Sequence, residues 1–232
     1  MAVEESWTKS RRTYPAGYSP TSPEAQLETL LARFDDFRYP GLDEMIRQLS
    51  GNRPEQAEHI QVALKISAVG QRLSIDPYLN YLPCLRWILR PWLRSRHFKV
   101  DRSILENSVL LWEEAHDFLR EWEGRMPGEV TAFWMQGGIH WRGFAPHLGR
   151  PVIVEQGQWV LPAFYSVQYL LTNRGRLKDG SELQLDCPVD LIEDPRGKMF
   201  LAFRMEPNGI LHLVKDWEQL AVDSHGIPTG FR

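Results

Sequence analysis

Residues 77–100 contain no aspartate or glutamate, and they carry a run of arginines with the chemistry of phosphate binding. Arg86, Arg90 and Arg94 recur at every fourth position. On a helix this spacing places three guanidinium groups on one face, about 6 Å apart, so that each can meet one phosphate. A tryptophan beside them adds a surface on which a base can stack. The nucleic-acid-binding residues that we predict are Arg86, Trp87, Arg90, Arg94, Arg96 and Lys99.

The residues that follow carry the opposite charge. Residues 86–102 hold six basic groups and one acid, whereas residues 101–124 hold seven acids and two bases. Two successive helices of opposite charge can fold back on each other, and each exposed pair then contributes about 0–1 kcal/mol. In that case the protein itself occupies the arginines, and this alternative stays open. The two cases differ in whether the arginines face Glu113, Asp117 and Glu121 or face away from them.

A second candidate site is the carboxylate set Asp186, Asp190 and Glu193. The two aspartates lie four residues apart on a predicted strand and therefore share a face. Converging carboxylates can hold Mg²⁺ or Mn²⁺ for phosphodiester cleavage, with Lys198 as a cation for the transition state. We prefer a simpler interpretation, based on the alternation of polar and apolar residues along the strand. In it the aspartates form the solvent-exposed side of an edge strand, which Pro188 marks. We therefore predict no metal site and keep these carboxylates as the alternative.

Other catalytic motifs are missing from the chain. The histidines form no HExxH or HxH pattern, and no serine occupies a GxSxG elbow. Neither GxxxxGK[ST] nor GxGxxG occurs, which argues against Walker or Rossmann nucleotide binding. We therefore expect no cofactor, and we expect a binding protein in preference to an enzyme.

The composition is that of an ordinary globular protein with room for a core. Apolar residues make up 43% of the 232 residues and charged residues 25%, and the net charge is −3, so only a local patch can indicate a partner. Cys84 and Cys187 form neither a disulfide framework nor a CxxC pair. The start has no signal-peptide pattern, and no apolar run reaches the roughly 18 residues of a membrane span. We expect a cytoplasmic protein that does not contact a membrane.

An amphipathic helix is needed to present the arginines, and residues 82–95 supply its pattern. Leu85, Ile88 and Leu89 fall on one arc at about 100° per residue, and the arginines fall on the other. Pro91 removes a backbone hydrogen bond, so the element can be kinked or divided into two short helices.

About five helices are predicted in residues 22–126, after a flexible polar tail at residues 1–21. The third helix follows the four-residue spacing of Ile60 and Leu64. The fifth is predicted over residues 103–123, from a capping box to a glycine. We expect these helices to form an N-terminal helical region.

The character changes in residues 127–232, where short apolar runs alternate with glycine and proline turns. Residues 163–172 fit a helix and a strand equally well. We predict an α+β fold in which the helical region is followed by a C-terminal antiparallel β meander, as an open sheet or a small barrel. The predicted strands are residues 130–135, 139–144, 152–154, 159–161, 183–191, 199–205 and 210–214.

Three hypotheses for the function remain. The leading one is a non-catalytic binding or assembly subunit of a ribonucleoprotein-type complex, with a protein partner and with RNA or DNA. It depends on the arginine stripe and on nine tryptophans, which are favoured at interfaces. The alternatives are a divalent-metal-dependent phosphodiesterase or hydrolase that uses Asp186, Asp190 and Glu193, and a protein–protein scaffold.

Overall fold

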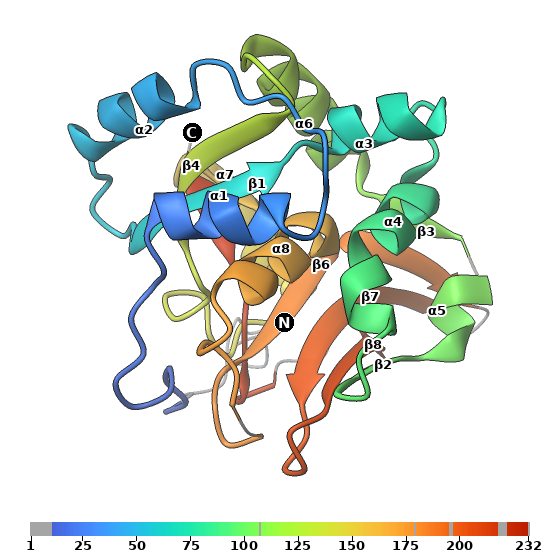
Figure 1. Cartoon of the computed structure of the whole chain (residues 1–232). Coiled ribbons are helices and arrows are strands. Elements are labelled where there is room, and N and C mark those ends of the chain that lie inside the picture. The colour runs from blue at the N-terminus through green and yellow to red at the C-terminus, as the bar shows by residue number, and fades with distance from the viewer. Residues whose placement is uncertain (1–10, 107, 179, 195–196, 218–221, 232) are drawn as a thin grey trace.

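The computed structural model describes residues 11–106, 108–178, 180–194, 197–217 and 222–231, without the side chains of 193 and 194. Within them, eight helices and ten strands interleave along the chain (Figure 1). The helices are α1 (Pro23–Leu31), α2 (Leu42–Ser50), α3 (Ile66–Leu73), α4 (Tyr81–Leu93), α5 (Arg102–Glu106), α6 (Glu113–Arg125), α7 (Pro146–Glu155) and α8 (Ala163–Thr172). The strands are β1 (His59–Leu64), β2 (Phe98–Val100), β3 (Val109–Leu111), β4 (Val130–Gln136), β5 (Gln158–Val160), β6 (Gln184–Asp194), β7 (Gly197–Met205), β8 (Leu211–Trp217), β9 (His225–Gly226) and β10 (Thr229–Phe231).

The first sheet has four antiparallel strands in the order β1-β4-β10-β5. β1 pairs with β4 along its whole length, from His59 opposite Met135 to Leu64 opposite Val130. β10 lies between β4 and β5, so the end of the described chain is built into the centre of this sheet. The sheet therefore joins segments from both halves of the sequence.

The second sheet is mixed, in the order β2-β8-β7-β6-β3, with β9 beside β6. β6, β7 and β8 pair antiparallel in sequence, whereas β2 and β9 pair parallel with β8 and β6. The register of β6 shifts between Cys187 and Leu191, and Pro188 lies within this irregularity. Proline has no N–H to donate, so an interior strand accepts it at such a point. The prediction that Pro188 marks an edge strand is wrong, because β6 lies between β7 and β3.

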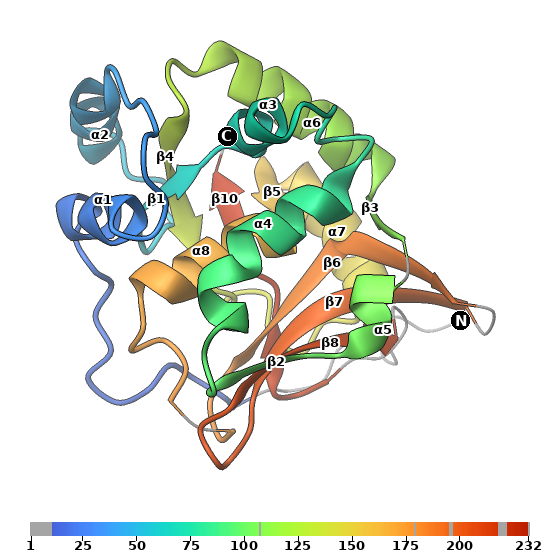
Figure 2. The same cartoon turned by 45° about the vertical axis from the view of Figure 1, so that its right-hand side comes forward.

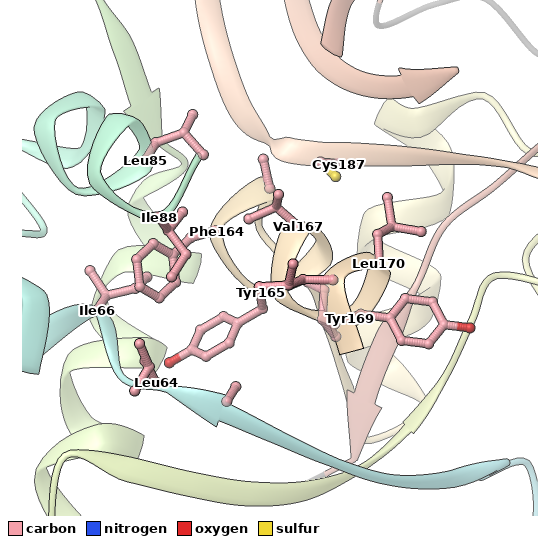
Figure 3. Close-up of a cluster of buried hydrophobic side chains, with 14 of the residues drawn as sticks. Leu64, Ile66, Leu85, Ile88, Phe164, Tyr165, Val167, Tyr169, Leu170 and Cys187 are labelled. Atoms are coloured by element: carbon pink, nitrogen blue, oxygen red, sulfur yellow. The ribbon is translucent and has the colours of Figure 1, made fainter. Parts of the chain in front are cut away.

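Helix α8 is the centre of the core and contacts both sheets, through β1 and through β6. All ten of its residues are buried, as expected for a helix that is apolar on every side. Figure 3 shows Tyr165 pointing from α8 towards Leu64 of β1, Phe164 beside Ile88 of α4, and Cys187 of β6 above the helix. The residues that fitted helix and strand equally well thus form a helix that holds the two sheets together.

The predicted order of a helical region followed by a β meander is wrong. Three strands lie before residue 127, and two helices lie after it. The third predicted helix contains β1, because Ile60, Val62 and Leu64 alternate as in a strand while Ile60 and Leu64 also satisfy helical spacing. All six residues of β1 are buried, the polar His59 and Gln61 among them, so both faces of the strand lie inside the protein.

The fifth predicted helix is also divided. α5 ends at Glu106, β3 pairs with residues 190–192 of β6, and α6 begins only at Glu113. In the β half, residues 152–154 belong to α7, and residues 139–144 form no named strand. The secondary structure of these segments depends on contacts with parts of the chain that are distant in sequence, and local spacing does not reveal such contacts.

The described part of the predicted tail lies against the folded chain. The hydroxyl of Tyr14 donates to Glu58 at 2.6 Å, and the ring of Tyr14 lies 4.3 Å from the guanidinium carbon of the fully buried Arg176. Thr21 donates its N–H to the side chain of Asn173 at 2.8 Å. Residues 1–10 of the tail lie outside the described residues. Among the described residues, no helix has both the length and the apolar composition needed to cross a membrane.

Candidate functional site

Helix α4 carries the predicted arginines and packs as its periodicity predicts. Leu85, Ile88 and Leu89 are buried, and Arg86 and Arg90 are exposed on the other face. The helix stays continuous for 13 residues with Pro91 inside it. Its last turn lies beside α8 and leads into β2 (Figure 2).

Pro91 determines where the side chain of Arg90 goes. A helix residue normally donates its N–H to the carbonyl four residues earlier, which for Pro91 is the carbonyl of Trp87. Proline has no N–H, and Nε of Arg90 donates to this carbonyl instead, at 3.1 Å. The guanidinium carbon then lies 4.2 Å from the ring centroid of Trp87, within the range of a cation–π contact. The side chain of Arg90 is therefore held by both the backbone carbonyl and the ring of Trp87.

The ring of Trp87 is used within the protein. It stacks on Phe34 with centroids 4.9 Å apart and meets the edge of Phe37 at 5.7 Å. Arg90 covers it as well. The predicted role of Trp87 as a surface for a base is therefore replaced, in the described structure, by a role in supporting Arg90 and the end of α1.

Arg90 and Arg94 line a cleft of about 860 Å³, together with three basic residues from other segments. Arg33 follows α1, Arg174 follows α8, and His97 precedes β2. No aspartate or glutamate is among the described residues that line it. Burial, and then the positive charge of Arg94, lower the pKa of Arg90. We call this feature the arginine cleft.

The floor of the arginine cleft is apolar. Phe34, Leu171 and Leu211 are buried residues that line it, and Trp92 and Met205 form half-buried walls. Nε1 of Trp92 is buried and has no hydrogen-bond partner among the described residues. Cations above an apolar floor match a ligand that joins phosphate groups to planar rings.

The remaining predicted residues lie outside the arginine cleft. Arg86 donates to the carbonyl of Leu105, at the end of α5. Nε of Arg96 donates to Nε2 of His97 at 3.1 Å, so Arg96 reaches the arginine cleft only through a residue that lines it. Lys99 is exposed on β2 and is not among the residues that line it.

The acidic helix does not neutralise the arginines. In the described part of the chain, no ion pair joins Arg86, Arg90 or Arg94 to α6. Asp117 pairs with the neighbouring His116 at 2.8 Å, and Glu121 pairs with Arg125 on its own helix. β3 separates α6 from α5, so the predicted helical hairpin of opposite charges does not form.

Two of the arginines that line the arginine cleft were not predicted from the sequence. Arg33 lies just after α1, and Arg174 lies beyond the last turn of α8. Arg33 stands alone on its segment, and Arg174 lies with Arg176 and Lys178 in a short basic stretch, at alternate positions that do not follow helical spacing. Only the packing of α1 and α4 against α8 brings them to the arginines of α4.

In the alternative carboxylate site, Asp186 and Asp190 each form a hydrogen bond within the protein. Asp186 is buried and lies 2.5 Å from Nδ1 of His225. Asp190 is fully buried and accepts the N–H of Ala163, the first residue of α8, at 2.7 Å. The prediction that these aspartates form the solvent-exposed side of the strand is wrong, because both are buried. Among the described side chains, no group of three histidines, cysteines or acids can hold a metal ion, and the side chain of Glu193 lies outside the described residues.

Comparison of the chain with protein-family models, with characterised proteins and with solved structures found no match. The function is therefore inferred from the site alone.

Proposed function

We propose that this protein binds single-stranded nucleic acid in the arginine cleft, as a non-catalytic subunit of a protein–nucleic-acid complex. One observation carries the proposal: four arginines from three segments line one cleft that has no acidic residue in its described lining. Assembling like charges is unfavourable in the free protein, and the charge of Arg94 adds to burial in lowering the pKa of Arg90. A polyanion relieves this repulsion when it binds.

The apolar floor supports a single strand as the ligand. Unpaired bases have exposed ring faces, and these pack on half-buried apolar and aromatic side chains such as Trp92 and Met205. In a duplex the ring faces are stacked inside, so the floor would contribute little. Phosphates on the arginines and bases on the floor together use both parts of the arginine cleft.

Four arginines alone give only modest affinity, because each neutralised phosphate contributes through the release of about 0.7 counterion on a single strand. A protein partner that extends the surface is therefore part of the proposal. We place this complex in the cytoplasm, a location supported by two buried cysteines that both remain free.

The test is binding of a short fluorescein-labelled oligouridylate, followed by anisotropy at low salt. The combined substitution Arg90→Ala and Arg94→Ala should raise the Kd by at least about tenfold, since each charge-assisted contact is among the stronger kinds of hydrogen bond. The matched control is Arg47→Ala with Arg125→Ala, two exposed arginines paired with glutamates on their own helices. Both double variants take the net charge from −3 to −5 by losing two arginines. The control should stay within about twofold of the unmodified protein.

Equal weakening by both double variants would show that only net charge matters, and would contradict a site at the arginine cleft. The same assay with oligodeoxythymidylate shows whether the 2′-hydroxyl contributes. Absence of binding to either oligonucleotide by the unmodified protein would contradict the proposed function as a whole.

A further inference from the structure

A second cavity, of about 390 Å³, lies between α6, α7, β5 and β6. It shares no lining residue with the arginine cleft. Its volume lies within the range of sites for small molecules, about 300–1,000 Å³. We call it the aromatic pocket, because it is lined by Trp112 just before α6, Phe118 of α6 and Trp159 of β5.

The ring of Trp159 is fixed in place by its surroundings. Its centroid lies 5.5 Å from that of Phe118, and 5.1 Å from those of Trp122 and Phe133. On the neighbouring strand β10, a Cβ at Gly230 would lie 2.3 Å from Nε1 of Trp159, so only glycine allows the indole to lie there. A rigid aromatic wall is suited to hold another ring face to face or edge to face.

Trp159 also carries an unsatisfied polar group. Its Nε1 is buried and has no hydrogen-bond partner among the described residues. Leaving a buried N–H unpaired is unfavourable for the folded state, so such a group needs an explanation. Nε1 lies close to Gly230 of β10, whereas the residue as a whole lines the cavity, so the ring current of a bound aromatic ligand should shift the indole N–H signal.

The lining holds two glutamates, one histidine and one arginine. Glu114 and Glu155 are exposed, whereas Arg150 is buried and lies 3.3 Å from the ring centroid of Trp112. Nη1 of Arg150 donates to the carbonyl of Pro188 at 2.5 Å, which fixes this side chain in the wall. Most of the remaining lining is apolar or aromatic. The carboxylates therefore lie at the exposed edge of the pocket, and its buried part is mostly apolar.

We propose that the aromatic pocket binds an uncharged planar ring compound, packed against the aromatic wall that Trp112, Phe118 and Trp159 form. Fit between flat ring faces gives the preference for a planar molecule over a globular one of equal carbon number. The mostly apolar lining gives the preference for a neutral molecule over the corresponding ions, because an ion would lose hydration there.

Isothermal titration calorimetry with 2-naphthalenemethanol tests this proposal. 1-Adamantanemethanol has the same number of carbon atoms but no flat face, and it should bind about two- to tenfold more weakly. Naphthalene-2-carboxylate and 2-naphthylmethylammonium should both bind no more tightly than the alcohol. The indole N–H signal of Trp159, assigned with Trp159→Phe, should move when 2-naphthalenemethanol is added.

Two substitutions on α7 locate the binding. Val154 lines the pocket and is 45% exposed, so Val154→Trp should fill the mouth and raise the Kd at least about tenfold. Leu148 is 39% exposed on the same helix but does not line the pocket, and Leu148→Trp should leave the Kd within about twofold. Failure of 2-naphthalenemethanol to bind, equal binding of the adamantane, or equal effects of the two tryptophans would overturn the proposal. The nucleic-acid assay is independent, so each result bears on one site only.

Discussion

Arg90 lies across the ring of Trp87 in its own helix, and its Nε donates to the carbonyl of the same residue at 3.1 Å. This carbonyl is available because Pro91, four residues later, has no N–H to donate to it. A proline that would ordinarily weaken a helix therefore fixes an arginine at the edge of the arginine cleft. Trp87 acts as a support for that arginine.

Replacing Pro91 should change stability and binding in opposite directions. Pro91→Ala restores the backbone N–H, which competes with Arg90 for the carbonyl of Trp87. The free energy of unfolding should rise by about 1–3 kcal/mol, because alanine favours a helix interior over proline. The affinity for oligouridylate should fall by about two- to fivefold, because Arg90 is no longer preorganised. Urea unfolding and anisotropy measure the two effects, and a stabilised protein with unchanged affinity would contradict this role of Pro91.

Salt should weaken the binding in proportion to the number of arginines in the arginine cleft. Four phosphate contacts on a single strand predict a slope of about −3 for log K against log salt. Arg90→Ala with Arg94→Ala should reduce the slope to about −1.4, and Arg47→Ala with Arg125→Ala should leave it unchanged. Binding constants at several salt concentrations give the slopes. The same slope for both double variants would contradict direct phosphate contacts at Arg90 and Arg94.

Asp190 should make the protein less stable as the pH rises. Burial raises the pKa of this carboxyl to about 7, against an ordinary value near 4. The folded protein therefore keeps a proton that the unfolded chain releases, so the stability present below about pH 4 is lost as the pH rises through 7. Asp190→Asn stays uncharged and can still accept the N–H of Ala163. It should match the unmodified protein near pH 4 and be more stable near pH 8, by at most about 4 kcal/mol.

Urea unfolding of both proteins at about pH 4 and pH 8 provides this comparison. Among the described residues, the hydroxyl of Tyr81, the N–H of Ala163 and the thiol of Cys187 lie close to Asp190. None of them changes charge between these pH values, since burial raises the pKa of the Tyr81 hydroxyl and of the Cys187 thiol further above their ordinary ranges. A constant difference in stability at the two pH values would show that Asp190 does not titrate in the folded protein.

Glu123 should be essential for the start of α3. Its buried carboxylate accepts the N–H groups of Ile66 at 2.9 Å and Ser67 at 2.8 Å, and the hydroxyls of Tyr78 and Tyr165. Glu123→Ala leaves these donors without an acceptor and should lower the free energy of unfolding by about 3–5 kcal/mol.

The control for Glu123 lies on the same helix. Glu121 is exposed and pairs with Arg125, so Glu121→Ala should change the free energy of unfolding by less than about 0.5 kcal/mol. Chemical unfolding of both variants measures the difference. Equal losses would mean that the buried hydrogen bonds of Glu123 are replaced when the side chain is removed.

Structure was predicted most accurately from the sequence where one face of a helix is buried and the other is exposed to solvent. In α4 the buried residues Leu85, Ile88 and Leu89 alternate with exposed arginines, and periodicity alone identifies both faces. β1 was mistaken for a helix because Ile60 and Leu64, which alternate with Val62 as in a strand, also satisfy helical spacing. Gln61, on that strand, is a polar residue at a position with no exposure, and its amide donates to the carbonyl of Val62. Apolar spacing does not reveal such satisfied buried groups.

Half of the candidate site was visible in the sequence. Arg90 and Arg94 stood out because they share one helix face, whereas Arg33 and Arg174 are brought to them by tertiary packing alone. Arg86 has the same spacing as Arg90 and Arg94 but turns to the carbonyl of Leu105. Helical spacing gives the direction of a side chain only to within one face, and the neighbouring segments decide which residues share a cleft.

The most direct test of the arginine cleft is the ¹H–¹⁵N spectrum of the arginine side chains during titration with oligouridylate. The Nε–H signals of Arg33, Arg90, Arg94 and Arg174 should shift together as the ligand saturates the protein. The signals of the control arginines, Arg47 and Arg125, should stay in place. Shifts confined to arginines outside the arginine cleft, with its four signals unchanged at saturation, would contradict the proposal that nucleic acid binds there.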